Sequence, residues 1–264
     1  MRLCNPSIRK SLLLPPCPLL PSDWPAPKFV LGFALHSQDY KVVAIAFKRI
    51  KRVELRVMGV AVYTLSNQQW SVRDNVLNID YSSFNNLYGA YYFCEGAAHW
   101  LRDAPLTPDE VTSYRFYNQT HLVSFDFDSE HFTFLELPVA LDELENYSGS
   151  LFILGESLAL FCISLLSFRI WVLKQENGNR LWTLWFSGPS SREGYEFFYH
   201  MGSPTKRVLY FEGDGGYLVY GKKSYNIVTC QVRELGKSMS YDSQLTTYSE
   251  SLVLCNQFGT VNMA

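Results

Sequence analysis

The sequence is poor in charge. Only 18% of its 264 residues are Asp, Glu, Lys or Arg, and the formal net charge is −2. A chain with so little charge of either sign has no general field that would attract nucleic acid or an anionic membrane. We therefore expect neither of them as a partner.

The sequence also lacks paired cysteines. No C-x-x-C pair occurs, and the six cysteines are scattered at long intervals: Cys4, Cys17, Cys94, Cys162, Cys230 and Cys255. This distribution argues against a zinc module and against a dense disulfide framework. We expect buried thiols in a reducing compartment, cytoplasmic and/or nuclear.

Long apolar runs are missing as well. The longest, from Leu158 to Phe168, is well short of the ~20 residues that span a bilayer, and Glu156 and Arg169 lie close to its ends. It is interpreted as a buried strand rather than a membrane helix. The apolar part of the amino terminus is interrupted by prolines within residues 15–18, unlike a signal peptide, so export is not expected.

No convincing amphipathic helix of ten or more residues is present, whereas aromatic residues reach 16%, with 18 Phe and 17 Tyr. Aromatic side chains fit the pleated, half-buried surface of a sheet. Short strand-like segments separated by Gly, Asn, Asp and Ser turns recur from end to end. The sequence predicts an all-β protein.

The strand-like segments repeat in units of roughly 40–60 residues, the size of kelch-type propeller blades. Each unit has two strand candidates followed by a hairpin whose second strand carries an aromatic residue. The first three units combine residues 29–47 with 61–72, 87–101 with 123–138, and 149–163 with 169–186. A fourth, less regular unit starts at 207–221 and continues through 225–232, and residues 250–255 are one more strand.

The length of the repeat distinguishes between two possible architectures. A pair of immunoglobulin-like sandwiches would also supply many short strands, but it predicts no repeat near 50 residues. Because one blade cannot bury both of its faces alone, the units are expected to stack around an axis. We predict one kelch-like propeller rather than two domains.

Four polar residues, Asp126, Asp128, Glu130 and His131, are crowded into VSFDFDSEHFTFLELP, residues 123–138. They could begin a metal or acid/base site, or they could turn a hairpin. Phe125 and Phe127 alternate with Asp126, as strand residues with opposite faces do. The calcium-loop pattern is absent, and Asp and Ser favour turns. The hairpin is the preferred interpretation, with the two Phe packed between blades and residues 128–131 turning the chain.

Three other motifs have weak chemical interpretations. Residues 155–159, GESLA, lack the last glycine of a nucleophile elbow, so Ser157 is expected on a strand. Residues 212–216, EGDGG, lack the Lys and helix of a phosphate loop and predict a turn. His99, beside Trp100 on an apolar strand, is expected to be a core histidine with satisfied hydrogen bonds.

One dense basic cluster remains. It could bind nucleic acid or an acidic partner, yet it falls where one strand gives way to the next. We favour a solvated loop. Its members are Lys48, Arg49, Lys51, Arg52 and Arg56.

The order of several motifs resembles the F-box-associated domain of plant F-box proteins. The matching segments are Asn5 to Lys10 with Leu13 to Pro15, Gly32-Phe33 with Asp39 to Val43, Val62-Tyr63 with Trp70, Gly96 with His99 to Leu101, Ser124 to Asp126 with Phe132 to Pro138, Leu154 to Leu158, Ile170 to Val172 with Trp182, and Tyr248 to Val253. Together they cover roughly residues 3 to 254.

The resemblance implies a kelch-like β-propeller that recognises substrates for an SCF-type ubiquitin ligase. Residues 1–22 would be its leading strand pair and residues 23–264 the propeller. Family members carry an F-box before this domain that docks on the Skp adaptor of a cullin ligase. Here only Met1 and Arg2 precede the first strand pair, so we expect contact with the Skp adaptor and cullin only if an F-box lies upstream.

The resulting expectation is a protein that binds a target protein through the loops of one propeller face. Aromatic and arginine side chains in those loops are the best anchors, although the substrate-binding residues are unknown. No residue is expected to be catalytic, to bind a cofactor or to bind a metal. The alternatives are an F-box-less interaction module or decoy and, from another class, a propeller enzyme with converging carboxylates or metal ligands.

Overall fold

The computed structural model describes residues 1–19, 27–51, 54–73, 91–103, 119–138, 148–164, 167–189, 198–202, 208–214, 220–226 and 231–238. Within these residues the chain forms β-strands and one short 3-10 helix. The predicted all-β class is confirmed. The predicted strand at residues 250–255 lies outside the described residues.

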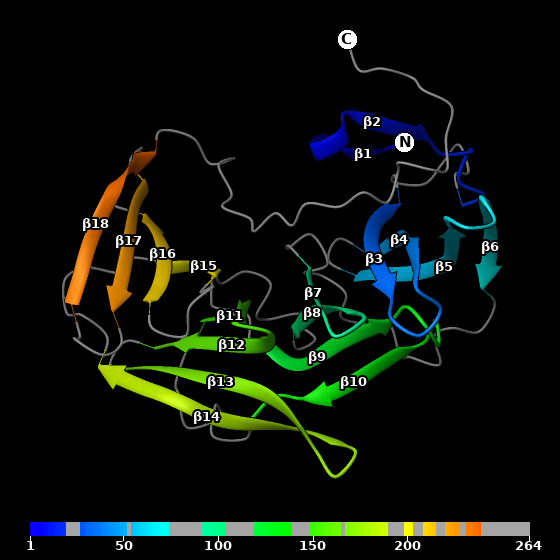
Figure 1. Ribbon diagram of the computed structural model, residues 1–264. Coiled ribbons are helices and arrows are strands. Elements are labelled where there is room, and N and C mark those ends of the chain that lie inside the picture. The colour runs from blue at the N-terminus through cyan, green and yellow to red at the C-terminus, as the bar shows by residue number, and fades with distance from the viewer. Residues whose placement is uncertain are drawn as a thin grey trace.

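Four antiparallel sheets of four strands follow one another along the chain (Figure 1). Sheet 1 contains β3 (Lys28–Ala34), β4 (Asp39–Lys51), β5 (Glu54–Thr64) and β6 (Gln69–Arg73). Sheet 2 contains β7 (Tyr92–Cys94), β8 (Ala97–Asp103), β9 (Gln119–Asp126) and β10 (Phe132–Glu136). Sheet 3 contains β11 (Ser148–Leu154), β12 (Ser157–Ile163), β13 (Ser167–Glu176) and β14 (Asn179–Pro189). Sheet 4 contains β15 (Phe198–Gly202), β16 (Val208–Asp214), β17 (Tyr220–Asn226) and β18 (Gln231–Ser238).

The first three sheets coincide with the three predicted units, but the fourth corrects the prediction. Sheet 4 begins with β15, before the predicted start at residue 207. This strand, FYHMG, is short and does not alternate apolar with polar residues, so periodicity could not find it. The predicted turn at residues 212–216 also begins too early, because Glu212 to Asp214 pair within β16.

The sheets are arranged radially. Contacts join β3 to β8, β7 to β11, and β11 to β15, so the first or second strands of neighbouring sheets lie towards one another. Figure 1 shows the sheets along an arc, with β6, β14 and β18 on its outer margin. Four-stranded units packed side by side around a centre form a β-propeller.

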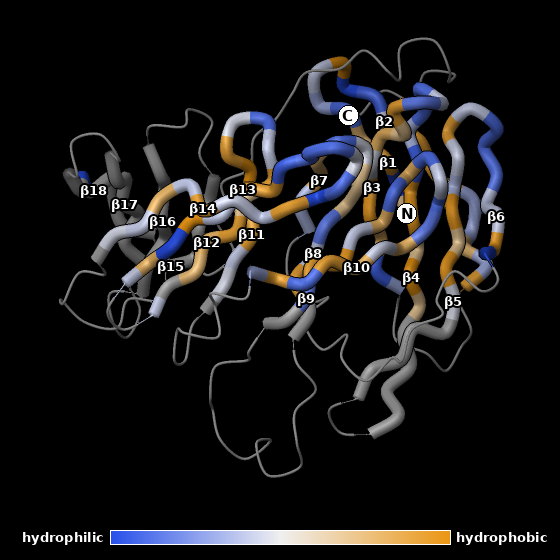
Figure 2. Tube along the Cα trace, turned by 90° about the horizontal axis from the view of Figure 1, so that it is seen from below, coloured by the Kyte–Doolittle hydropathy of each residue, from blue (hydrophilic) through white to orange (hydrophobic). Residues whose placement is uncertain are grey.

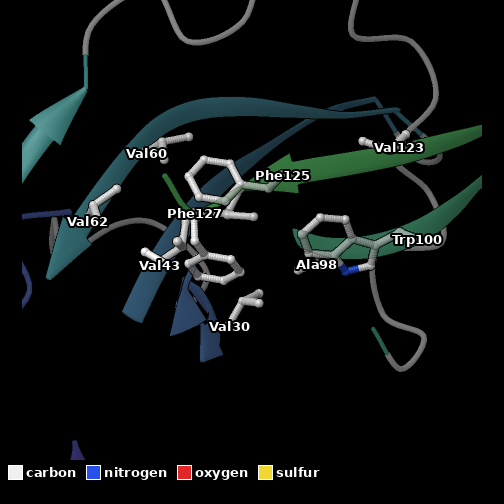
Figure 3. Packing of buried hydrophobic residues seen from close by; sticks show 11 residues of the cluster. Val30, Val43, Val60, Val62, Ala98, Trp100, Val123, Phe125 and Phe127 are labelled. Atoms are coloured by element: carbon white, nitrogen blue, oxygen red, sulfur yellow. The ribbon is translucent and has the colours of Figure 1, made fainter. Parts of the chain in front are cut away.

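Among the described residues, the side chains between sheets 1 and 2 form the largest hydrophobic cluster. Phe125 of β9 and the following Phe127 point towards sheet 1, as Figure 3 shows, where Val43 of β4 and Val62 of β5 lie. Phe125 and Phe127 are fully buried, with their ring centroids 5.4 Å apart and the rings nearly perpendicular. The prediction that these two Phe pack between blades is confirmed.

Gly32 of β3 makes this packing possible. A Cβ atom at Gly32 would lie 2.2 Å from two atoms of the Phe127 ring. Carbon atoms in contact are normally about 3.5–4.0 Å apart. The ring therefore occupies the space that any side chain at position 32 would need.

The apolar run in sheet 3 is buried strand, as predicted. Leu158, Leu160 and Cys162 of β12 pack on the side of sheet 2, whereas Ala159 and Phe161 belong to the cluster on the opposite face. A strand that is buried on both faces is apolar at every position, which explains the run. No helix among the described residues is long and apolar enough to cross a bilayer.

The amino-terminal residues form a strand pair that covers the other face of sheet 1. β1 (Arg2–Asn5) and β2 (Lys10–Leu13) flank the 3-10 helix η1 (Pro6–Ile8) and form a separate two-stranded sheet. Leu3 and Leu12 pack against the buried Val42 and Tyr63. Figure 2 shows the hydrophobic positions gathered in the strands and the hydrophilic ones in many of the turns.

Candidate functional site

Six hairpin turns lie at the same end of sheets 1 to 3. In an antiparallel sheet, the turn after the first strand and the turn after the third strand share one end. In sheet 1 the two turns also touch, because Ser66 donates its N–H to the Asp39 carboxylate at 3.2 Å. We call this surface the hairpin-turn face; it comprises residues 35–38, 65–68, 95–96, 127–131, 155–156 and 177–178.

Asp126 shapes the β9–β10 turn. Its Oδ1 accepts hydrogen bonds from the backbone N–H groups of Asp128 at 3.1 Å and Ser129 at 2.7 Å. Glu130 donates its N–H to the Asp126 carbonyl at 2.9 Å and has a φ of 58°. A short acidic side chain that bonds the backbone ahead of it is a standard way to make a turn. The hairpin interpretation of this segment is confirmed.

Asp128 does more than turn the chain. Its carboxylate accepts the N–H of His36 at 2.8 Å and both the N–H and the Oγ–H of Ser37, at 3.0 and 3.2 Å. Burial tends to raise the pKa of the Asp128 carboxyl, but the hydrogen bonds from His36 and Ser37 outweigh it and lower the pKa. Asp128 thus joins the β9–β10 turn of sheet 2 to the β3–β4 turn of sheet 1.

Glu130 makes a second link between the same sheets. Its Oε1 lies 2.8 Å from Nζ of Lys41 on β4, and its Oε2 accepts from Arg73 on β6. Lys41 also donates to the Phe127 carbonyl at 2.7 Å. Residues 128–131 turn the chain as expected, and Asp128 and Glu130 in addition link two sheets. Their partners lie on another sheet, where no local pattern could show them.

The four polar residues do not converge on one point. Asp126 and Asp128 face backbone N–H groups, Glu130 faces two cations, and Nδ1 of the exposed His131 lies 2.5 Å from the Ser129 carbonyl. Among the described residues, no group of three or more His, Cys, Asp or Glu is placed to hold a metal ion. The arrangement is a structural clamp between two sheets.

Further contacts hold the turns of sheets 1 to 3 together. A Cβ atom at Gly96, where φ is 75°, would lie 3.1 Å from the Leu35 side chain, so the β7–β8 turn lies against the β3–β4 turn. The Cys94 thiol donates to the Glu156 carbonyl of the β11–β12 turn at 3.3 Å. Ser157 follows that turn as the first residue of β12, so the predicted strand serine is confirmed.

His99 is a core residue, as expected. Its side chain is 2% exposed, and its Nε2 lies 3.3 Å from the Cys94 carbonyl while Nδ1 lies 2.8 Å from the Ser124 hydroxyl. Because a carbonyl can only accept, Nε2 carries the proton and Nδ1 accepts from Ser124. Burial lowers the pKa of His99 to about 4, so the ring is neutral near pH 7.

The basic cluster lies at the other end of sheet 1. Lys48 and Arg49 pair with Arg56 and Leu55, and Lys51 pairs with Glu54, so β4 and β5 extend almost to their connection. The predicted loop is therefore wrong for these positions, which belong to strands. Arg52 lies outside the described residues.

Comparison with known families supplies the context for this face. The model of the F-box associated beta propeller domain matches residues 3–255. No curated protein matches the chain. The matched range includes all four sheets and the hairpin-turn face.

Proposed function

Because the chain belongs to the F-box-associated β-propeller family, we propose that it recognises a target protein for an SCF-type ubiquitin ligase. The hairpin-turn face is the target-binding surface. The observation that carries this assignment is that six turns from three sheets lie at one end and that contacts across the sheets fasten four of them. Asp128 ties its turn to residues 35–38, Gly96 lies against Leu35, and Cys94 bonds the turn at residues 155–156.

Such fastening matters for affinity. Loops that are already held in place lose little conformational entropy when a partner binds, so more of the contact energy appears as affinity. The side chains that remain free for a partner are those that point away from the clamp. Leu35 is 49% exposed, and Glu95 and Glu156 are also exposed.

The ligase role is tested by affinity purification of two versions of the protein from plant cells: the chain itself, and the chain extended through any F-box that is encoded upstream. We expect the extended version to recover the Skp adaptor and cullin, and both versions to recover the same target proteins. An extended version that recovers targets but no Skp adaptor would remove the ligase assignment and leave an interaction module.

The binding surface is tested with matched variants. Leu35→Glu and Glu156→Arg change charge at exposed positions of the hairpin-turn face, and Thr133→Arg changes it at an exposed position of β10. With these changes made in the extended version, we expect the two turn variants to lose target proteins and Thr133→Arg to retain them, with equal recovery of the Skp adaptor by all three. Loss of targets in the β10 variant alone would place the surface elsewhere.

A further inference from the structure

The outer edge of β14 differs from the other outer strands. Among the described strands β14 pairs only with β13, and it lies on the lower margin of the molecule in Figure 1. In an antiparallel sheet every second residue of such a strand directs its N–H and C=O away from the sheet. This row of donors and acceptors fits another extended backbone.

Natural sheets protect their edges with short strands and charged residues. β6 and β10 have 5 residues each and end in Arg73 and Glu136, and β18 carries Arg233, Glu234 and Lys237. By contrast, β14 has 11 residues, and no charged residue follows Arg180. It is the outer strand with the least protection against the addition of a further strand.

The register of β14 limits where a strand could be added. A bulge interrupts the pairing with β13 between Ile170 and Trp171, opposite Phe186 and Leu184. A bulge bends a strand and disrupts the ladder locally. Residues 179 to 184 pair regularly with residues 176 to 171, so this half of β14 is the part with a regular outer edge.

Exposed apolar side chains flank this regular half on both faces. Leu184 lies opposite Trp171 and is 45% exposed, whereas Leu181 lies opposite Lys174 on the other face and is 50% exposed. An added strand with apolar residues at alternating positions would cover one or the other leucine. Large exposed apolar side chains on an unpaired edge are a feature of strand-addition sites.

The positive charges near the β13–β14 turn indicate which end of the added segment is acidic. Arg180 and the exposed Lys174 lie beside the β13–β14 turn on opposite faces of sheet 3, and no ion pair with another described residue is found for either. Arg180 is half-buried, and its charge also acts on Cys94 and His99 of sheet 2. An acidic residue would complement them. In antiparallel addition, the carboxyl end of the segment lies beside the amino end of β14, where Arg180 is located.

We propose that residues 180–184 of β14 bind an extended segment of the target protein as an antiparallel fifth strand of sheet 3. The segment has apolar residues at alternating positions and acidic residues at its carboxyl end. This inference names the partner chemistry of the proposed protein-binding function and rests on it. The edge continues from the β13–β14 turn of the hairpin-turn face, so one target can occupy both surfaces.

The probe is a fluorescein-labelled peptide, Thr-Val-Thr-Val-Thr-Val-Glu-Glu, whose binding to the full chain is measured by fluorescence anisotropy. One control peptide carries N-methyl groups at alternating residues, which removes backbone donors. A second control ends in Lys-Lys. We expect the N-methylated peptide to bind about tenfold more weakly than the probe, and the Lys-ended peptide to bind more weakly as well.

Variants locate the site. Leu184→Lys and Leu181→Lys place a protective charge on each face of β14, and Val72→Lys places the same charge on β6, where Val72 is 49% exposed. We expect both β14 variants to weaken probe binding by about tenfold or more, and Val72→Lys to bind as the wild type does. Thermal unfolding of each variant establishes that it is folded.

Three results would overturn the inference: equal binding of the N-methylated peptide, equal weakening by Val72→Lys, or a wild-type dimer in sedimentation velocity that Leu184→Lys dissociates. The last would assign the edge to a second copy of this chain. Failure here is distinguishable from failure of the proposed function, because a chain that ignores the probe yet still recovers targets by affinity purification loses only the β14 assignment.

Discussion

Gly32 offers the most direct test of how sheets 1 and 2 pack. In Gly32→Ala, the new methyl group would lie 2.2 Å from two atoms of the Phe127 ring and 2.6 Å from a third. The ring is fully buried and is packed against Phe125 and Phe93, with centroids 5.4 and 5.9 Å away. Relief of the overlap would therefore require the two sheets to move apart. Overpacking of a close-packed core costs typically about 1–3 kcal/mol, and we expect the upper end here.

A double-mutant cycle separates this contact from other effects. Phe127→Ala alone should cost about 3–5 kcal/mol, because it leaves a cavity between the sheets. In the double variant the methyl group at position 32 fills part of that cavity instead of meeting the ring. The cost of the double variant should therefore be about 2 kcal/mol smaller than the sum of the costs of the two single variants.

Equilibrium urea denaturation, followed by both tryptophan fluorescence and circular dichroism, measures the four free energies of unfolding. Gly178→Ala is the control, because a Cβ there would meet nothing within 4 Å and its φ of 82° makes any cost one of backbone strain alone. Its effect should not depend on Phe127. Additive costs for Gly32→Ala and Phe127→Ala would refute the packing described for these two residues.

Three further predictions concern the same two sheets. Phe125→Ala should lower the free energy of unfolding by about 3–5 kcal/mol because Phe125 is fully buried, whereas Asp128→Ala should cost less at pH 7. Asp128→Ala should also flatten the loss of stability below pH ~3.9, since a carboxyl group with a lowered pKa stabilises the fold only while it is ionised. Equal costs of the two variants at pH 7 would contradict this. His99 has a pKa of about 4 in the folded protein, so the unfolded chain binds a proton at this side chain first as the pH drops. The free energy of unfolding of the wild type should therefore fall by about 3 kcal/mol between pH ~6.5 and 4. Chemical denaturation of His99→Gln over the same pH range should not show this fall. Glu130→Gln should lower the free energy of unfolding by about 3 kcal/mol, because it leaves Lys41 buried without its carboxylate partner. The double variant Lys41→Met with Glu130→Leu should be less destabilised than Glu130→Gln, as measured by the midpoints of urea denaturation. A double variant that is more destabilised would contradict the description of Lys41 and Glu130 as a buried ion pair.

The class and the repeat of this fold could be predicted because both are local properties. The alternation of Phe125, Asp126 and Phe127 determines which residues face the core, and the spacing of turns marks the first three sheets. Sheet 4 was misjudged at β15 because FYHMG has neither alternation nor a turn signal of its own. Its pairing with β16 supplies the hydrogen bonds that make it a strand.

The candidate site could be predicted only in outline. The sequence identified residues 128–131 as a turn and His99 as a core residue, and both interpretations are confirmed. It could not show that Asp128 binds the turn at residues 36 and 37. A carboxylate in a turn accepts the same kind of hydrogen bond from a nearby backbone N–H as from one that is distant in the sequence.

The sequence by itself thus determined most of the strands, the inward faces of the first three sheets and the family, since these depend on residue order over short distances. Only the tertiary structure decided which turns share one end and which charges are paired. Lys41 is 89 residues from Glu130 along the chain, and His36 is 92 residues from Asp128. Those pairs exist because adjacent sheets bury their apolar faces against each other and thereby bring the ends of the strands together.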